Sequence, residues 1–216
     1  PLDRSFLITD LQPQMAFGVA SIDRQELKNN AVAMAKAAKV FNVPTFITTV
    51  ETENFSGFTF PEILQVFPEA VVYERSSMNS WDSKKLRDDI KALGRKKLIM
   101  CGLWTEVCIN TAANSAMSED FEVYVVADVC GATSPMAQKY SMQRMVQAGI
   151  RPLTWQQLML EWQRDWARRD TYKAVMDIVR EHSGGYGMGV DYAYTMVHQE
   201  PQSGAWRGKV GDAPTA

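Results

Sequence analysis

Short apolar runs alternate along the chain with longer segments in which apolar residues recur at helical spacing. The apolar runs predict strands at residues 5–9, 44–50, 70–73, 97–102, 122–127 and 150–153. The helical spacing predicts helices over residues 24–41, 83–93, 106–119, 135–148, 155–168 and 172–182. Strands that alternate with helices form parallel sheets through right-handed crossovers. We therefore expect a three-layer α/β/α, doubly wound fold around a mostly parallel sheet of about six strands.

The composition changes beyond Asp170, where a helical stretch is followed by glycines and aromatic residues. They include Gly184, Gly185, Gly187, Gly189, Tyr192, Tyr194 and Trp206. We therefore divide the chain into a domain of residues 1–169 and a C-terminal extension of residues 170–216. A tail of this kind has little core of its own, so we expect it to pack on a neighbouring subunit in preference to acting as a flexible linker.

The chain has 216 residues, 46% of them hydrophobic, which suffices for one globular domain with a substantial core. The formal net charge is −2 and the basic residues form no stripe, so nucleic acid is not an expected partner. No apolar run is long enough to span a membrane, and the first residues do not resemble a signal peptide. An odd number of cysteines favours free thiols, so we expect a cytoplasmic protein with no membrane partner.

Three reactive side chains fall just after predicted strands, where open parallel sheets bind their ligands: Asp10, Arg75 and Cys108. Cys108 lies in the first turn of a predicted helix, whose dipole favours the nucleophilic thiolate. The alternative for any single cysteine is a small buried hydrophobic residue, which suits Cys101 inside its strand. Cys130 is expected in the loop after the fifth strand.

A carboxylate near a thiol can act as its general base, so Asp10 is a candidate for that role, although it could simply bond turn amides. The only histidines, His182 and His198, lie far along the chain, which disfavours a Cys–His pair. Arg75 is either a surface arginine or a fixed cation that stabilises negative charge. Trp81 precedes a helix start, with Asp82 or Ser83 as N-cap, and could form a wall of a pocket.

Three segments together resemble the isochorismatase-like cysteine hydrolases, and in particular their YcaC-like branch. The segment GLWTEVCIN (residues 102–110) is similar to the GxxTxxC signature of that family. The run TDLQ (residues 9–12) resembles its first-strand aspartate, and RSSMNSWDS (residues 75–83) resembles the matching segment of the YcaC-like branch. The similarity extends in order and spacing over roughly residues 5–168.

The resemblance implies a catalytic triad of Cys108, Asp10 and Arg75 that hydrolyses a small non-peptide amide or related C–N bond through a thioester. Most of the family has lysine where Arg75 stands, and an arginine could act only electrostatically. The family also implies a cis peptide bond at Leu103–Trp104 and an oxyanion hole formed by the amides of Trp104 and Cys108. Thr105, as N-cap, could instead occupy the Cys108 amide.

Nicotinamidases of the same family bind a metal through histidines after the second strand. The corresponding residues 51–61 contain no histidine. We therefore expect neither a metal nor another cofactor, and we do not expect nicotinamide to be the substrate. The predicted substrate pocket comprises Phe55, Trp81, Trp104 and Thr105, with Phe55, Phe58 and Phe60 open to an alternative role in packing between subunits. The resemblance implies a homo-oligomer.

Two other functions remain open from the sequence. One is vinyl-ether cleavage of the isochorismatase type, which needs an acidic aspartate and no cysteine nucleophile, so Cys108 argues against it. The other is a catalytically silent or redox-responsive oligomeric scaffold. A dinucleotide-binding domain is excluded because the turn after the first strand, DLQPQMAFG, lacks the glycine-rich phosphate loop.

Overall fold

The structure is a computed structural model that describes residues 3–197. Six strands form one sheet in which every neighbouring pair is parallel, in the order β3-β2-β1-β4-β5-β6. The strands are β1 (Arg4–Thr9), β2 (Thr45–Val50), β3 (Val72–Arg75), β4 (Lys97–Leu103), β5 (Glu122–Gly131) and β6 (Arg151–Leu153). The order reverses between β1 and β4, as in a doubly wound sheet, which confirms the predicted fold class.

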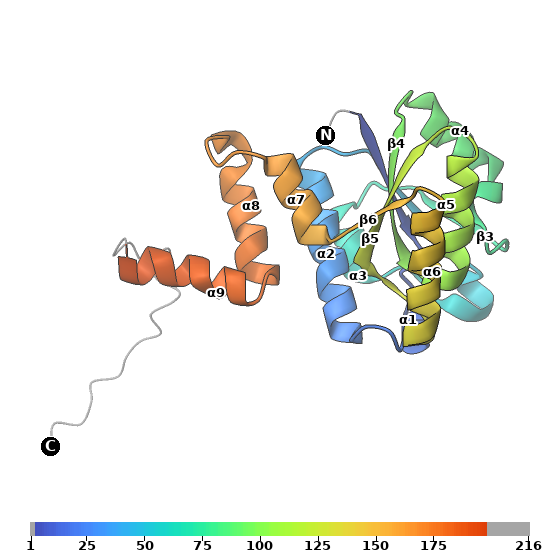
Figure 1. Cartoon of the computed structure of the whole chain (residues 1–216), viewed down its shortest axis with the longest axis horizontal. Helices are drawn as coiled ribbons and strands as arrows, with labels where there is room; N and C mark the ends of the chain where they lie inside the picture. Colours follow the sequence, from blue (N-terminus) through green and yellow to red (C-terminus); the bar gives the residue numbers. More distant parts are fainter. Residues whose placement is uncertain (1–2, 198–216) are drawn as a thin grey trace, which may run out of the picture. The chain divides into compact units, whose positions relative to one another are not determined.

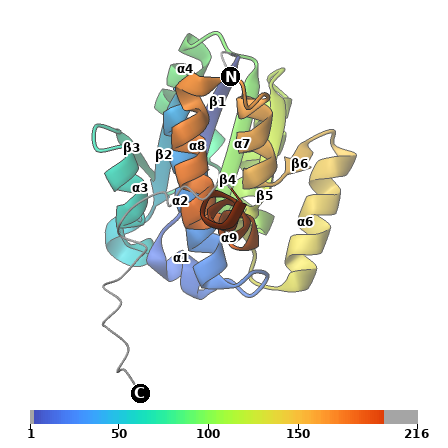
Figure 2. The ribbon, with the colours of Figure 1, turned by 90° about the vertical axis from the view of Figure 1, so that its left-hand side faces the viewer.

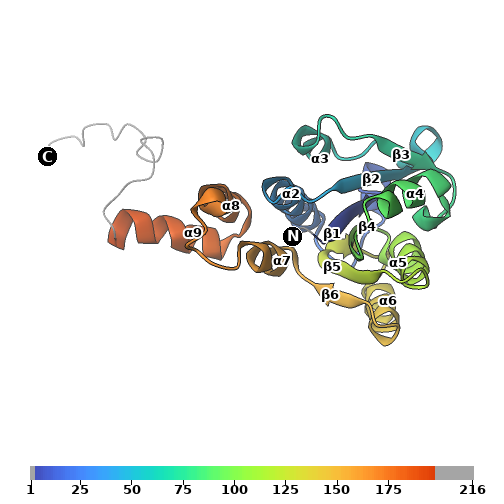
Figure 3. The ribbon, with the colours of Figure 1, turned by 90° about the horizontal axis from the view of Figure 1, so that it is seen from above.

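Helices cover both faces of this sheet (Figures 1 and 3). One face carries α2 (Arg24–Val40), α3 (Pro61–Val66) and α7 (Trp155–Gln163), with α2 in contact with the other two. The other face carries α4 (Lys84–Ala92), α5 (Asn110–Met117) and α6 (Pro135–Gln147). A short helix, α1 (Pro13–Phe17), follows β1, and the turns η1 (Thr52–Ser56), η2 (Ser80–Asp82) and η3 (Thr105–Ile109) follow β2, β3 and β4.

The core lies between the sheet and its helices. The side chains of β1 are buried on both faces, with Phe6, Leu7 and Ile8 at most 1% exposed, as expected for a central parallel strand. The inner face of α2 is rich in buried alanines, which let the helix lie close to the sheet. Side-chain caps begin several helices, including Ser83 at α4, as predicted, and each such cap stabilises its helix by about 1 kcal/mol.

Several predicted boundaries are wrong. The third strand lies two residues later than expected, so Arg75 is its last residue. The fifth strand runs on to Gly131, which places Cys130 in β5 and not in a loop. The helix predicted at residues 106–119 begins as the π-helical turn η3 before α5, and the helix predicted at 155–168 ends at Gln163, because Arg164 has a φ of 61°.

The chain divides into two compact units, Pro1–Val175 and Met176–Ala216. The helix α8 (Arg169–His182) runs across that division, and α9 (Gly185–Tyr192) and η4 (Ala193–Val197) belong to the second unit. Figure 2 labels α8 and α9. The glycines of α9 therefore form a helix that the sequence pattern did not predict. Gly187 allows the close approach of α9 to α8, because a Cβ there would lie 2.6 Å from the carbonyl oxygen of Val179.

The predicted packing of the extension on a neighbouring subunit stays a prediction. Trp206 and His198, which the sequence analysis considered, lie outside the described residues. In the part of the chain that the structure describes, we find no helix with the length and apolar character of a membrane span.

Candidate active site

Asp10 is held at the carboxyl end of the central strand β1 by hydrogen bonds with Thr48 and Arg75. Its backbone N–H donates to the carbonyl oxygen of Thr48 (3.0 Å), and Oδ1 accepts a bond from the Thr48 hydroxyl (3.3 Å). The guanidinium of Arg75 donates to both carboxylate oxygens, each at 2.6 Å. Asp10 has a φ of 55°, a left-handed conformation that aspartate tolerates better than most residues. The chain therefore turns sharply after β1 and leaves the carboxylate at the sheet edge.

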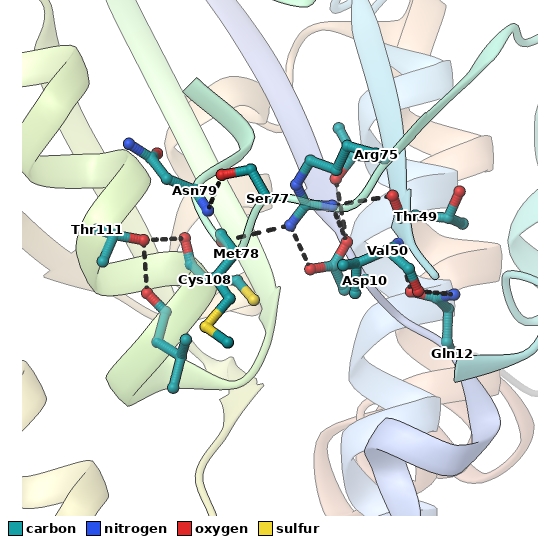
Figure 4. Close-up of polar contacts among 12 residues, drawn as sticks. Asp10, Gln12, Thr49, Val50, Arg75, Ser77, Met78, Asn79, Cys108 and Thr111 are labelled. Carbon is teal, nitrogen blue, oxygen red and sulfur yellow. Dashed lines mark hydrogen bonds and ion pairs between the residues drawn. The ribbon is translucent and has the colours of Figure 1, made fainter. Parts of the chain in front are cut away.

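Arg75 reaches Asp10 from the end of β3, two strands away. Its Nη1 also donates to the carbonyl oxygen of Thr49 (3.0 Å), so the guanidinium spans the intervening strand β2 (Figure 4). The Arg75 and Asp10 side chains are 5% and 0% exposed, so the ion pair is buried. Burial opposes the charge of Arg75, but the hydrogen bonds and charge of Asp10 raise its pKa above the ordinary value. Arg75 is therefore a permanent cation in this site.

Cys108 completes the group from the turn η3 after β4, and its thiol lies beside the Asp10 carboxylate, close enough for the two groups to shift each other's pKa. The residue is 2% exposed. The structure thus brings together Asp10, Arg75 and Cys108, which are far apart in sequence (Figure 4).

The expected shift of Cys108 toward thiolate is wrong for the resting site. Burial and the negative charge of Asp10 raise the pKa of Cys108 to about 12, although Arg75 acts in the opposite direction. Burial likewise raises the pKa of Asp10, against the influence of Arg75, Cys108 and Thr48. The resting group therefore holds a thiol, with one proton to share between Cys108 and Asp10.

The peptide bond Leu103–Trp104 is cis, as the family resemblance implied. Trp104 is anchored by its indole N–H, which donates to the carbonyl oxygen of Met15 (2.8 Å). The preceding Gly102 has a φ of 135°, and a Cβ there would lie 1.7 Å from the carbonyl oxygen of Thr9. Only glycine therefore lets β4 lie this close to Thr9, the last residue of β1, which directly precedes Asp10.

Thr105 does not cap the turn that carries Cys108. The N-cap position belongs to Trp104, and Thr105 is the first residue of η3. The Thr105 hydroxyl is fully buried and bonds no group of residues 3–197, so it does not occupy the Cys108 amide. The predicted cap at Thr105 is wrong because the turn begins one residue earlier than expected.

The other predicted pocket residues lie in different surroundings. Trp81 is 2% exposed and its ring packs edge-on against Phe121, with centroids 5.3 Å apart, so it belongs to the core beside α5. Phe55 lies in η1 and is 59% exposed. Phe60 is buried and Phe58 is 66% exposed.

Gln12 supports the site in a way that the sequence analysis did not consider. It is fully buried, and its amide bonds both backbone groups of Val50 at the end of β2, at 3.0 and 3.2 Å. Its Nε2 also donates to the carbonyl oxygen of Gly57 (2.5 Å). Gln12 therefore fixes the loop after β2 to the turn after Asp10. The sequence feature that could have pointed to this role is an amide side chain two residues after Asp10, the aspartate at the end of the first strand.

No group of three or more His, Cys, Asp or Glu side chains within residues 3–197 is arranged to hold a metal ion. The site is a cluster of a thiol, a carboxylate and a guanidinium, from Cys108, Asp10 and Arg75, at the carboxyl edge of a doubly wound sheet. The net charge of the cluster is zero. Such a cluster defines a site for nucleophilic and acid–base chemistry on a small molecule.

The comparisons with known proteins agree with this class. The isochorismatase domain family matches residues 5–157, so the chain belongs to that family, one of isochorismatase-like hydrolases. The chain is 33% identical over 185 residues to the probable hydrolase YcaC of Escherichia coli, covering 85% of this chain and 88% of that protein.

Two solved structures of YcaC proteins resemble this one. The E. coli YcaC structure is described as an octameric hydrolase of unknown specificity; it is 32% identical, has a TM-score of 0.86, and the match covers 91% of this chain and 95% of that one. The YcaC of Pseudomonas aeruginosa, described with hexane-2,5-diol and covalent acrylamide, is also 32% identical, has a TM-score of 0.84, and the match covers 88% and 93% of the two chains.

Proposed function

We propose that this protein is a cysteine-dependent hydrolase of a small non-peptide amide or a related C–N bond. The observation that carries the proposal is the position of the Cys108 thiol against the Asp10 carboxylate, which Arg75 holds with two 2.6 Å hydrogen bonds. A thiol, an adjacent base and a group that orients the base are the parts that covalent catalysis needs.

The charge balance of the site explains how the thiol is activated. Loss of the Cys108 proton to solvent would leave two negative charges beside one cation, which agrees with the pKa of about 12. Transfer of the same proton to Asp10 leaves the net charge of the cluster at zero. Burial raises the pKa of both groups, and the positive charge of Arg75 stabilises the thiolate that the transfer forms. Activation therefore runs through Asp10 when a substrate carbonyl is at hand.

The reaction then proceeds in two halves. Asp10 takes the Cys108 proton, the sulfur attacks the amide carbon, and the carbonyl oxygen becomes an oxyanion. The protonated Asp10 gives its proton to the amide nitrogen as the C–N bond breaks, which releases the amine and leaves a thioester. Asp10 next takes a proton from water, the hydroxide oxygen attacks the thioester, and the acid leaves as the thiol regains its proton from Asp10.

We propose the backbone amides of Trp104 and Cys108 as the oxyanion hole. Support comes from the Trp104 backbone, which lies near enough to the Cys108 sulfur to lower its pKa, and from the Thr105 hydroxyl, which does not bond the Cys108 amide. Backbone donors of this kind, placed where the charge develops, contribute about 3–4 kcal/mol each to the barrier reduction. Arg75 stays protonated throughout and stabilises the negative charge of Asp10.

Covalent acrylamide in the P. aeruginosa relative supports a reactive nucleophile in this group of proteins that accepts a small amide. We expect Cys108 to add to the alkene of acrylamide, with the neighbouring carbon taking the proton. The octamer of the E. coli relative supports a homo-oligomer here, and we propose a cytoplasmic protein whose C-terminal extension contributes to that assembly.

The test is release of ammonia from a panel of small primary amides, with hydroxylamine added to trap the thioester as a hydroxamate. We expect Cys108→Ala to abolish both products while the protein stays folded. Cys130→Ala is the matched control, because it removes another fully buried thiol from a neighbouring strand and should keep the activity. Turnover by Cys108→Ala would refute the proposal.

A further inference from the structure

A cleft of about 610 Å³ opens at the ends of β2 and β3, on residues that the proposed reaction does not use apart from Arg75. It is bounded by the loop after β2 and by α3. One part of its wall is apolar and another part is acidic. The apolar part consists of Phe58, Leu64 and Val72, and the acidic part of Glu51, Glu53 and Glu74.

Two buried polar groups in the wall are unpaired. The Thr59 side chain is on a residue only 3% exposed, and its hydroxyl bonds no group of residues 3–197. The Arg75 side chain is 5% exposed, and its Nε has no hydrogen-bond partner in the same part of the chain, although both terminal nitrogens are bonded. Buried polar groups in proteins are nearly always paired, so the Thr59 hydroxyl left over beside this cleft indicates a ligand.

The charge of the cleft is negative. Glu74 accepts bonds from the hydroxyls of Thr49 and Thr52, both at 2.5 Å, and from the Thr52 amide, which together help to hold its pKa below the ordinary value against burial. These partners are neutral, and the positive charge of Arg75 is already matched by Asp10. Glu53 is exposed and forms no ion pair with the described residues. A cation is therefore the complementary ligand.

We propose that this cleft binds a primary ammonium compound with a short apolar body. The ammonium group lies against the carboxylates of Glu53 and Glu51, and the apolar body covers Phe58 and Leu64. One ammonium N–H donates to the Thr59 hydroxyl. The same ligand chemistry could belong to the far end of the amide substrate or to a separate small molecule, and the experiment below distinguishes the two.

Benzylammonium is a suitable probe, and benzyl alcohol is its neutral analogue of similar size. Binding is followed by saturation-transfer NMR on the full chain carrying Cys108→Ser, so the result does not depend on hydrolysis or on the proposed function. We expect benzylammonium to bind saturably and benzyl alcohol to bind about tenfold or more weakly, since the difference is one charged contact.

Three variants localise the binding. Glu53→Gln removes one charge at constant shape and should weaken benzylammonium several-fold, and Thr59→Val removes the hydroxyl at nearly constant volume and should do the same. Glu69→Gln is the matched control, because Glu69 is an exposed carboxylate outside the cleft. Equal affinity for the two probes, no saturable binding, or equal effects of Glu53→Gln and Glu69→Gln would each overturn the proposal.

The source of the ligand follows from the rate at which iodoacetamide alkylates Cys108 in the wild-type chain with the cleft saturated. Slower alkylation supports the far end of a substrate, because the occupant then blocks the path to the thiol. An unchanged rate supports a separate ligand of the same chemistry.

Discussion

Replacement of Arg75 by methionine tests the buried ion pair on which the whole site depends. Methionine keeps much of the length of the arginine side chain and removes its charge. The Asp10 side chain is 0% exposed and would keep the Thr48 hydroxyl as its hydrogen-bond donor, with the Cys108 thiol beside it. Removal of one member of a buried pair costs about 3–5 kcal/mol, because the other charge stays buried.

Coulomb's law gives a similar magnitude. Two unit charges about 4 Å apart at an effective dielectric constant of about 20 attract by about 4 kcal/mol. Since domains of ordinary size are stable by about 5–15 kcal/mol, the variant should remain folded but lose a large part of its stability near neutral pH. Urea unfolding at one fixed protomer concentration measures the loss.

The pH dependence of this loss identifies its cause. Without the cation, the pKa of folded Asp10, already raised by burial, rises further above the unfolded value of about 3.9. A folded carboxyl with a raised pKa costs no stability below the unfolded pKa, and the cost appears as the pH rises through the folded pKa. The deficit of Arg75→Met relative to wild type should therefore be small near pH 4 and reach its full size near pH 8.

The double variant Asp10→Asn/Arg75→Met is the control, because it removes both charges. Its loss should be smaller than the sum of the two single losses by about 3 kcal/mol. A loss below 1 kcal/mol for Arg75→Met that does not change with pH would refute the reasoning, since it would mean that the charge of Asp10 is not buried against Arg75.

Two further predictions concern the same edge of the sheet. Because Asp10 must be ionised to accept the thiol proton, kcat/KM for amide hydrolysis should fall as the pH drops through a pKa above the usual carboxyl value. In addition, Asp10→Asn should lower the pKa of Cys108 below about 12, measured from the rate of iodoacetamide alkylation against pH. An unchanged alkylation profile would contradict the coupling of Cys108 to Asp10. Gln12→Leu should leave the backbone groups of Val50 buried without their amide partner, at a cost of about 1–3 kcal/mol each. Urea unfolding should show the loss of stability, and hydrogen exchange of the Val50 amide should become faster. Wild-type exchange at the Val50 amide would show that Gln12 does not hold the loop.

The central part of the fold was predictable because local pattern and burial agree there. The strands β1, β2 and β4 are short apolar runs bounded by polar residues, and parallel strands buried on both faces have this sequence pattern. The carboxyl edge of such a sheet is also where Asp10, Arg75 and Cys108 had to converge. Errors of position arose where the pattern is weak, as in β3, whose four residues are only partly buried.

The properties that the sequence did not reveal depend on contacts between distant segments. The helix-dipole argument for Cys108 considers one element, but the pKa of its thiol is set by burial and by Asp10 from another strand. Trp81 looked free for a pocket because nothing near it in sequence indicates Phe121, its packing partner. Helix propensity likewise disfavours the glycines of α9, yet Gly187 is required where α9 meets α8.

The identity of the cation also determines which group moves protons. A lysine, which most of the family has at this position, can exchange its proton, whereas arginine keeps its proton at every pH relevant to the reaction. Of the two ionised groups in this cluster, Asp10 alone can therefore accept and return a proton in the reaction that we propose. The bidentate geometry of Arg75 keeps both carboxylate oxygens bonded at 2.6 Å, so the carboxylate must give up part of that contact when it is protonated. Burial raises the pKa of Asp10 and so helps the carboxyl to hold that proton, although it raises the pKa of the Cys108 thiol as well.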